Sequence, residues 1–274
     1  MGEAGRVMRS PTTSSPPPPA HLLQQLVTGP TLVSHVVWRD RIDSTNAEAA
    51  RRAKEGAPEG LLVLADVQTA GRGRQGRRWQ APLGTSLMVS VLLRPNAPID
   101  QTTLLPLLVG LVVVEACEAL VPSAQLSLKW PNDLLANGRK CAGILVEVPT
   151  RGGVVAGAGI NVDWRSVRRP AGLTSTTSLA EVSHGGVDRW RLLQILLEQL
   201  DRRYRAWRDN PRGFLPAYRE RCVTIGQTVR VEQLDGQVLT GTATGVTDDG
   251  ALLVDMAGAG VTVRAGDVHH LRHR

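Results

Sequence analysis

The residues best suited to chemistry stand together in residues 71–79, the glycine- and arginine-rich stretch GRGRQGRRW. Its three glycines let backbone N–H groups approach an anion closely, and its four arginines supply planar forks that match phosphate and carboxylate groups. Such a loop is suited to gripping a nucleotide or an acyl phosphate. The same composition is also typical of a solvated basic loop or of a segment that contacts RNA, so composition alone leaves both interpretations open.

A second polar group follows in residues 129–133, KWPND, with Lys140 seven residues after Asp133. An aspartate after a proline is most often a turn residue, but here several chemically useful types are concentrated within fifteen residues. Asn132 and Asp133 offer the oxygen atoms that a hard cation such as Mg²⁺ prefers. Only three of the 32 basic residues are lysines, and two of them, Lys129 and Lys140, lie here, which indicates a need for a compact ammonium group.

The surrounding pattern predicts the elements that hold these residues. Thr45 and Glu48 have the spacing of a capping box, which predicts a helix over residues 47–55 and places residues 43–46 at its N-terminus. Strands at residues 61–66 and 86–93 leave residues 68–84 as a long connection, and long connections in compact domains are commonly functional. The further predicted elements are helices over residues 104–120, 188–208 and 214–221, strands over residues 125–130, 141–148 and 154–161, and a hairpin turn at Asn137 and Gly138.

The chain divides into three parts by composition and sequence pattern. Residues 1–20 are rich in proline and serine and cannot bury enough apolar surface to fold, so we expect a disordered tail. Residues 21–221 carry the helices, the strands and the polar segments described above, as one domain. Residues 222–274 alternate turn signals with short strands, which predicts a small all-β barrel; these strands lie at residues 228–233, 238–246, 251–256 and 261–264.

Composition excludes some classes of protein. Hydrophobic residues make up 42% and charged residues 21% of the chain, and the longest apolar run, residues 104–114, is shorter than the roughly 20 residues of a membrane span. Three scattered cysteines support neither a disulfide framework nor a zinc site, and no secretory signal is visible, so we expect a cytoplasmic protein with no membrane contact. A net charge of +7 suits nucleic-acid binding, but an excess of arginine reflects genome composition as readily as a partner.

Four motifs in a fixed order give the sequence a specific resemblance. They are residues 44–46 (STN), 68–79 (QTAGRGRQGRRW), 129–133 (KWPND) with Lys140, and 157–161 (GAGIN). This set resembles the biotin protein ligases, the biotin–acetyl-CoA-carboxylase ligases, from about residue 36 to the C-terminus. The resemblance implies an α+β fold, with a mixed sheet and flanking helices like that of class II aminoacyl-tRNA synthetases and biotin synthetases, followed by an SH3-like C-terminal β-barrel.

The resemblance also implies a two-step reaction that uses ATP and Mg²⁺ with biotin as substrate. Biotin would be adenylated to biotinyl-5′-AMP and then passed to a lysine of a biotin carboxyl carrier domain, the expected protein partner. A monomer or a weak homodimer is expected. Both steps pass through concentrated negative charge, so cationic and N–H donors should be the main catalytic device.

Carried over residue by residue, the family motifs imply a role for each position. Lys140, Arg72 and Arg74 are expected to be catalytic, with Lys140 between the biotin carboxylate and the α-phosphate. Asp133 is also expected to face the Mg²⁺ that ATP carries. The biotin-binding residues implied are Ser44, Thr45, Asn46, Gln68, Arg72, Gly73, Arg74, Lys140 and Gly143, and the ATP-binding residues implied are Arg77, Arg78, Trp79, Asn132, Asp133 and Asn161.

Two features depart from the family pattern. Nothing before Leu22 provides the winged helix of bifunctional members, so we expect a monofunctional type that binds no DNA sequence-specifically. Cys141 stands beside Lys140, and an inert buried thiol is the simplest interpretation.

Two other functions stay open at this point. A lipoate or octanoate ligase would share the fold, but the Arg-Arg-x-x-Gly-Gly-Gly run expected there is missing from the sequence. A basic nucleic-acid-binding protein would use the arginine-rich stretch and the barrel, yet residues 222–274 contain no Phe, Tyr or Trp on which a base could stack.

Overall fold

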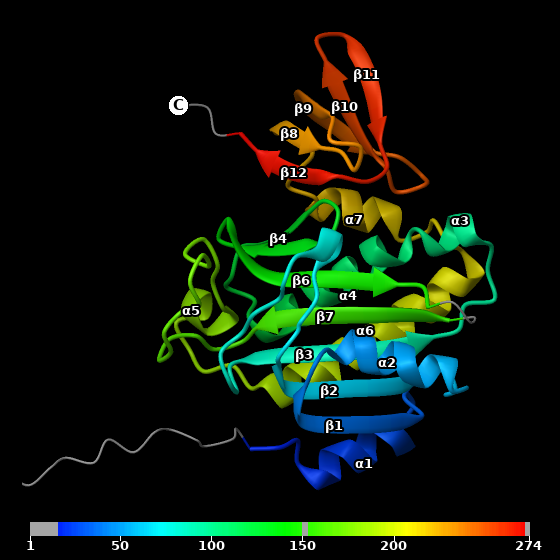
Figure 1. Ribbon diagram of the computed structural model, residues 1–274, viewed down its shortest axis with the longest axis vertical. Coiled ribbons are helices and arrows are strands. Elements are labelled where there is room, and N and C mark those ends of the chain that lie inside the picture. Colours follow the sequence, from blue (N-terminus) through cyan, green and yellow to red (C-terminus); the bar gives the residue numbers. More distant parts are fainter. Residues whose placement is uncertain (1–15, 150–152, 272–274) are drawn as a thin grey trace, which may run out of the picture.

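A mixed seven-stranded sheet forms the centre of the molecule in the computed structural model, which describes residues 16–149 and 153–271 (Figure 1). Its strand order is β1-β2-β3-β7-β6-β5-β4, with β1 and β2 parallel and every other neighbouring pair antiparallel. The strands are β1 (His35–Ile42), β2 (Leu61–Gln68), β3 (Ser86–Leu93), β4 (Leu126–Lys129), β5 (Asp133–Ala136), β6 (Arg139–Glu147) and β7 (Val154–Asn161). The mixed sheet that the sequence predicted is confirmed.

Two long helices cover one face of this sheet. The apolar helix α4 (Leu105–Leu120) is buried between the sheet and α6 (Arg189–Asp209), which begins at the predicted cap, Asp188. One stretch of the described residues, Asp100–Leu120, has the length and composition to cross a membrane, but most of it is buried here as a core helix. The remaining helices on the periphery are α1 (Ala20–Thr28), α3 (Ile99–Thr102), α5 (Leu179–Ser183) and α7 (Leu215–Arg221).

The opposite face of the sheet carries the short helix α2 (Thr45–Lys54) over β2, β3 and β7. Strand residues alternate between faces, so alternate residues of β7 pack in two different apolar clusters. Ala156 and Ile160 belong to the main core with α4 and α6, whereas Val155 packs with Ala49 and Ala53 of α2. Gly157 and Gly159 share the face of Val155, and the room left by their missing side chains is taken by Asn46 and Trp79.

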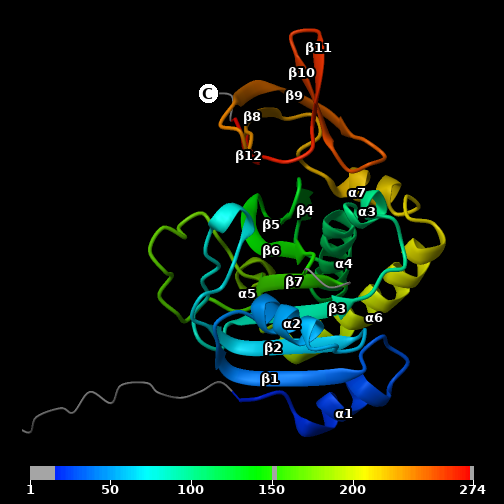
Figure 2. The same ribbon diagram turned by 45° about the vertical axis from the view of Figure 1, so that its right-hand side comes forward.

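The C-terminal domain is an antiparallel sheet of order β11-β10-β9-β8-β12, and the predicted small β domain is confirmed. It stands beyond the β4 edge of the large sheet, with α7 between the two (Figure 2). Val223 N–H donates to the Leu128 carbonyl at 2.8 Å, which ties its first residues to β4. Its strands are β8 (Thr228–Glu232), β9 (Val238–Val246), β10 (Leu252–Met256), β11 (Ala259–Val263) and β12 (Asp267–His270).

Three details differ from the sequence predictions. Helix α2 begins at Thr45 because Ser44, rather than Thr45, is its cap and accepts the Ala47 N–H. Strand β12 was not predicted, since it is short and polar. The predicted tail lies outside the described residues up to residue 15. Its last residues pack on the fold, because Pro18 is buried and the Pro16 carbonyl accepts a hydrogen bond from Arg189 at 3.0 Å.

Candidate active site

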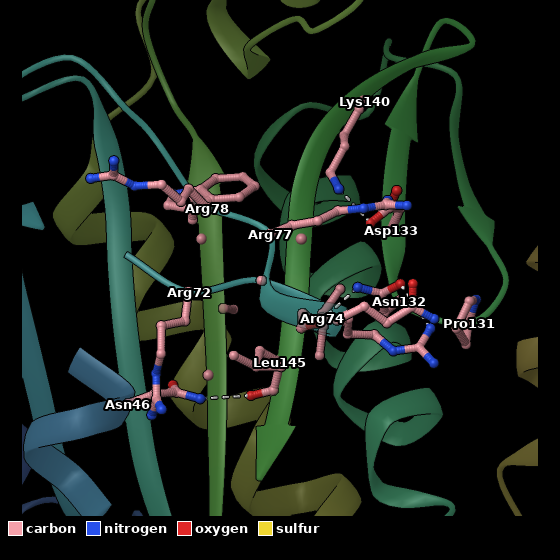
Figure 3. A pocket seen from close by; sticks show the side chains of 18 of the residues that line it. Asn46, Arg72, Arg74, Arg77, Arg78, Pro131, Asn132, Asp133, Lys140 and Leu145 are labelled. Atoms are coloured by element: carbon pink, nitrogen blue, oxygen red, sulfur yellow. Dashed lines mark hydrogen bonds and ion pairs between the residues drawn. The ribbon is translucent and has the colours of Figure 1, made fainter. Parts of the chain in front are cut away.

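One cavity collects the polar motifs from distant parts of the chain. It lies between the α2 face of the sheet and the arginine loop, residues 71–78 (Figure 3). Residues 266–268 of the C-terminal domain also line it. Of the predicted site residues, only Asn161 does not line it. The lining residues from the sequence prediction are Ser44, Thr45, Asn46, Gln68, Arg72, Gly73, Arg74, Arg77, Arg78, Trp79, Asn132, Asp133, Lys140 and Gly143. Side chains separated by up to about a hundred positions in sequence therefore meet at one place.

The first end of the cavity is a buried, uncharged hydrogen-bonding pole at the N-terminus of α2. Thr45 donates both its backbone N–H and its hydroxyl to Gln68 Oε1, at 2.7 and 3.2 Å. Ser90 of β3 is fully buried, and its hydroxyl lies 2.8 Å from Thr45 Oγ1. Because a buried polar group is costly unless it is paired, this cluster fixes Thr45 and Gln68 in place.

Asn46 is the most constrained residue of this pole. Its Nδ2 donates to the Leu145 carbonyl at 3.1 Å and to Glu147 Oε2 at 2.8 Å, while its Oδ1 lies 2.6 Å from Ser90 Oγ. Gly157 lies directly beneath it, so closely that a β-carbon there would be 1.9 Å from Asn46 Oδ1. The sequence prediction gave Asn46 to biotin, and the structure brings it to the cavity as a residue that orders its neighbours.

Trp79 lies on a floor of two glycines in the middle of the cavity. Gly143 of β6 and Gly159 of β7 are register partners, and β-carbons on them would lie 3.0 and 2.4 Å from the Trp79 indole. The indole therefore packs flat on bare backbone. Its Nε1 is buried without a hydrogen-bond partner among the described residues, and Lys140 Nζ lies 5.9 Å from the ring centroid.

Backbone hydrogen bonds within the arginine loop hold its two ends together. The Gly73 N–H donates to the Arg77 carbonyl at 2.7 Å, and the Trp79 N–H donates to the Gly71 carbonyl at 2.9 Å. These two bonds fold the loop into a tight flap over the sheet. The loop therefore has a defined backbone conformation and forms part of the cavity wall.

Each guanidinium of the loop has a partner on the protein. Arg72 pairs with Glu147 at 2.9 Å, Arg74 lies 3.5 Å from Asn132 Oδ1, and Arg77 forms an ion pair with Asp267 of β12. Arg78 donates to the Thr69 carbonyl at 3.0 Å, and in Figure 3 its guanidinium points away from Asp133. Of the two arginines predicted to reach the outer phosphates, only Arg77 faces the Asp133 end in this conformation.

The second end of the cavity is a cationic pole on the β5–β6 hairpin. Lys140 Nζ lies 2.6 Å from Asp133 Oδ1, and Asn132 is held by a bond from its Nδ2 to the Ile144 carbonyl at 3.0 Å. Burial lowers the pKa of Lys129 and also the pKa of Arg74, and the nearby Asp133 opposes both effects. Four cations, Lys129, Lys140, Arg74 and Arg77, thus lie near two carboxylates, Asp133 and Asp267, and the excess of positive charge suits an anion.

Asn161 and Cys141 lie away from the cavity lining. Asn161 is buried and donates from Nδ2 to the Thr177 carbonyl at 2.9 Å, while its Oδ1 has no partner among the described residues. The predicted nucleotide contact of Asn161 is therefore not made by a side chain that lines the cavity in this conformation. Cys141 is fully buried, and burial raises its thiol pKa, which agrees with an inert thiol.

The sequence did not point to three residues that form or support the cavity. Ser90 stands in an otherwise apolar strand, although a serine on a buried strand is itself a signal. Glu147 ends β6 and binds Asn46 and Arg72. Asp267 and its neighbours Gly266 and Val268 come from the unpredicted strand β12 and its approach. The C-terminal domain therefore builds part of the cavity wall.

The two domains match two family descriptions. The Biotin/lipoate A/B protein ligase family matches residues 38–164, and the Biotin protein ligase C terminal domain matches residues 224–271. The Biotin–[acetyl-CoA-carboxylase] ligase of Mycobacterium tuberculosis is 42% identical over 234 residues, which cover 84% of this chain and 86% of that protein. The chain belongs to the biotin protein ligases.

Other members of the family agree with this assignment. The Bifunctional ligase/repressor BirA of Bacillus spizizenii is 38% identical over 229 residues, or 81% of this chain and 69% of that protein. The biotin protein ligase from Aquifex aeolicus, solved in complex with biotin and ATP, is 28% identical with a TM-score of 0.75, and the match covers 88% of this chain and 100% of that one. The family and fold that the motifs predicted are confirmed.

Proposed function

We propose that this protein activates biotin with ATP and transfers the biotinyl group to a lysine of a biotin carboxyl carrier domain of a carboxylase. One observation carries the proposal: a single cavity joins an uncharged hydrogen-bonding pole at Thr45 and Gln68 to a cationic pole at Lys140, with Trp79 between them. A ligand with a neutral polar ring at one end and a carboxylate at the other suits such a cavity. Biotin has this shape.

The uncharged pole suits the ureido ring of biotin. A ureido group is neutral and presents both N–H donors and a carbonyl acceptor, so it needs fixed partners of both kinds rather than a counter-charge. Ser44 and Thr45 offer hydroxyls, and Gln68 offers an amide that its bond to Thr45 has already oriented. We assign Asn46 to this pole as the residue that holds the others, because its own amide is engaged by Ser90, Leu145 and Glu147.

The cationic pole suits the first chemical step. An oxygen of the biotin carboxylate forms a bond to the α-phosphorus of ATP while the bond to pyrophosphate breaks, so negative charge gathers between the two reactants. Lys140 would leave its bond to Asp133 and lie between the carboxylate and the phosphate. Arg74 reaches the same place from the loop. Preorganised cations of this kind are worth several kcal/mol in a water-poor site.

The nucleotide fits the region between Trp79 and the hairpin. The exposed side of the Trp79 indole offers a stacking surface for adenine. The buried Oδ1 of Asn161 lacks a donor among the described residues, and an adenine amino group would supply one if the cavity opened toward it. Asn132 and Asp133 supply one amide and one carboxylate oxygen, which fits a Mg²⁺ held mainly by ATP phosphates; Mg²⁺ would neutralise phosphate charge there.

The second step needs access for a protein and exclusion of water. The lysine amine forms the amide bond to the biotinyl carbonyl carbon, the bond to AMP breaks, and the amine releases a proton. The arginine loop lies over the cavity, and its closure on an anionic adenylate would keep water from the mixed anhydride. Transfer to a carboxylase subunit fits a cytoplasmic enzyme, the compartment that we propose. A monomer or weak homodimer remains our expectation.

The two alternative functions gain no support from the cavity. Members of the matched family also include lipoate ligases, but the polar ureido-type pole has no use for the apolar tail of lipoate or octanoate. The nucleic-acid alternative requires arginines that are free to bind phosphate. Although Arg72 and Arg77 are exposed, the guanidinium groups of Arg72, Arg74 and Arg77 already contact Glu147, Asn132 and Asp267 at the cavity.

Substrate choice and transfer test the proposal together. The protein is incubated with ATP and Mg²⁺ plus biotin, lipoate or octanoate, and then with a carrier domain or its Lys→Arg variant at the acceptor position. We expect pyrophosphate release with biotin but not with lipoate or octanoate. We also expect a mass shift of one biotinyl group only on the carrier that retains its lysine. Release with lipoate or octanoate at the rate seen with biotin would contradict the proposed substrate.

A further inference from the structure

The Trp130 side chain joins the two domains at the edge of the nucleotide region. It follows β4, precedes Asn132 and is 2% exposed. Both of its N–H groups donate to residues after the catalytic domain: the backbone N–H donates to Thr224 Oγ1 at 3.0 Å, and the indole N–H donates to the Gly250 carbonyl at 2.9 Å. Trp130 is thus a point at which the C-terminal domain holds the KWPND motif.

Thr224 also contacts His270 of β12. It is fully buried, and its Oγ1 lies 3.1 Å from His270 Nε2. Because its oxygen accepts the Trp130 N–H, its one hydroxyl hydrogen is free to be donated to His270. Burial, with a smaller effect of Lys129, lowers the pKa of His270 to about 4, so the ring is neutral at pH 7 and can accept that hydrogen. The chain of bonds therefore runs Trp130, Thr224, His270.

Both ends of this series of hydrogen bonds belong to segments that line the cavity, the KWPND motif and β12. On the catalytic side, residues 130–133 run from Trp130 to Asn132 and Asp133, the predicted nucleotide and Mg²⁺ contacts. Other contacts also support that segment. On β6, Ile144 N–H donates to the Asn132 carbonyl at 2.8 Å and Lys140 binds Asp133. Asp133 also pairs in register with Lys129 of β4, and Arg74 of the loop lies 3.5 Å from Asn132 Oδ1. On the C-terminal side, β12 also carries Asp267, the partner of Arg77.

We propose that Thr224 and His270 are positioning residues for ATP: by fixing Trp130 they set where Asn132 and Asp133 lie, without touching the nucleotide. This inference rests on the proposed function and adds to it a specific route by which the C-terminal domain acts on the catalytic domain. Among the residues that the structure describes, no hydrogen bond joins Thr45 or Gln68 of the biotin pole to the bonds of Trp130 and Thr224, so we expect biotin binding to be unaffected.

Matched substitutions at Thr224 test the proposal in the full-length protein. Thr224→Val keeps the shape but removes the hydroxyl, which leaves the buried Trp130 N–H unpaired. Thr224→Ser keeps the hydroxyl. Thr244→Val, on the exposed face of β9, is the control for the same substitution outside the network. The measured quantities are the KM for ATP and the KM for biotin in pyrophosphate release, with thermal unfolding alongside.

We expect Thr224→Val to raise the KM for ATP about tenfold and to leave the KM for biotin unchanged, because loss of one buried hydrogen bond has about this effect. Thr224→Ser and Thr244→Val should behave like wild type. If Thr224→Val does not fold, His270→Phe removes the acceptor while it keeps an aromatic ring, and a rise of about threefold in the KM for ATP alone is expected.

Three results would overturn the inference. They are an unchanged KM for ATP in the folded Thr224→Val and His270→Phe variants, an equal rise in the KM for biotin, or no recovery with Thr224→Ser. Failure of the proposed function has a different signature, because wild-type protein itself would then release no pyrophosphate with biotin.

Discussion

Two glycines of β7, two residues apart, should separate the two substrates when each is replaced by alanine. A β-carbon at Gly157 would lie 1.9 Å from Asn46 Oδ1, and a β-carbon at Gly159 would lie 2.4 Å from Trp79 Cε2. We expect Gly157→Ala to impair the use of biotin and Gly159→Ala to impair the use of ATP.

The size of each effect follows from the displacement that it forces. Nonbonded carbon atoms pack about 3.5 Å apart, so Trp79 must move by about 1 Å to admit the Gly159→Ala methyl group. Asn46 must move at least as far for Gly157→Ala, although bonds to Ser90, Leu145 and Glu147 hold it. A displacement of about 1 Å in a positioned group costs about 10²-fold in rate, or about 2.7 kcal/mol.

Pyrophosphate release measured against each substrate is the assay. We expect kcat/KM for ATP to fall about 10²-fold in Gly159→Ala and kcat/KM for biotin to fall about 10²-fold in Gly157→Ala. Gly143→Ala meets the same indole at 3.0 Å and should have a smaller effect on ATP, and Gly245→Ala, 3.8 Å from its nearest neighbour, is the control. Equal losses for both substrates in both variants, or no loss, would refute the two-pole account.

Three other predictions concern the cations and the pH dependence. Lys140→Ala should lower the single-turnover adenylation rate by about 10²–10³ and leave thermal unfolding unchanged, whereas the exposed Lys54→Ala should have no effect; a near-normal rate in the first variant would refute its role. Trypsin should cut the arginine loop more slowly when biotin and ATP are present, and Glu147→Gln should speed cleavage of the free protein because it weakens the pairing of Arg72; the same rate in all cases would argue against a closing loop. The free energy of unfolding should rise with pH between about 4 and 6.5, because the folded pKa of His270 is below its ordinary value and the unfolded chain binds more protons in that window. Urea titrations of wild type and His270→Asn should show a smaller rise in the variant, and identical curves would contradict the assignment.

The sequence predicted best where one local pattern decides the structure. The apolar run at residues 86–93, the glycine-rich segment at residues 154–161 and the alternating pattern at residues 238–246 coincide with β3, β7 and β9. Strand β12 was missed because its sequence, DVHH, is short and polar, and its pairing with β8 supplies what its own composition does not. The local sequence pattern therefore does not predict a strand that is stabilised mainly by pairing with a distant strand.

The site shows the same division. Arginine, glycine and lysine types at motif spacing pointed to residues that the structure brings to one cavity, because the chemistry of anions limits which residues can serve. The hydrogen bonds that orient these residues were out of reach. Ser90, Glu147 and Thr224 act across strands and across domains, at sequence distances of up to about a hundred residues, so no window along the chain contains both partners.

Formation of biotinyl-5′-AMP by the isolated protein is the most direct test of the central claim, since it requires both poles of the cavity and no carrier. The protein, in excess over biotin, is mixed with ATP and Mg²⁺, and the acid-quenched products are separated by liquid chromatography and identified by mass. The account predicts biotinyl-AMP and pyrophosphate in equal amounts, limited by the biotin added. Bound biotin with no biotinyl-AMP, in wild-type protein that is folded and saturated with ATP, would contradict it.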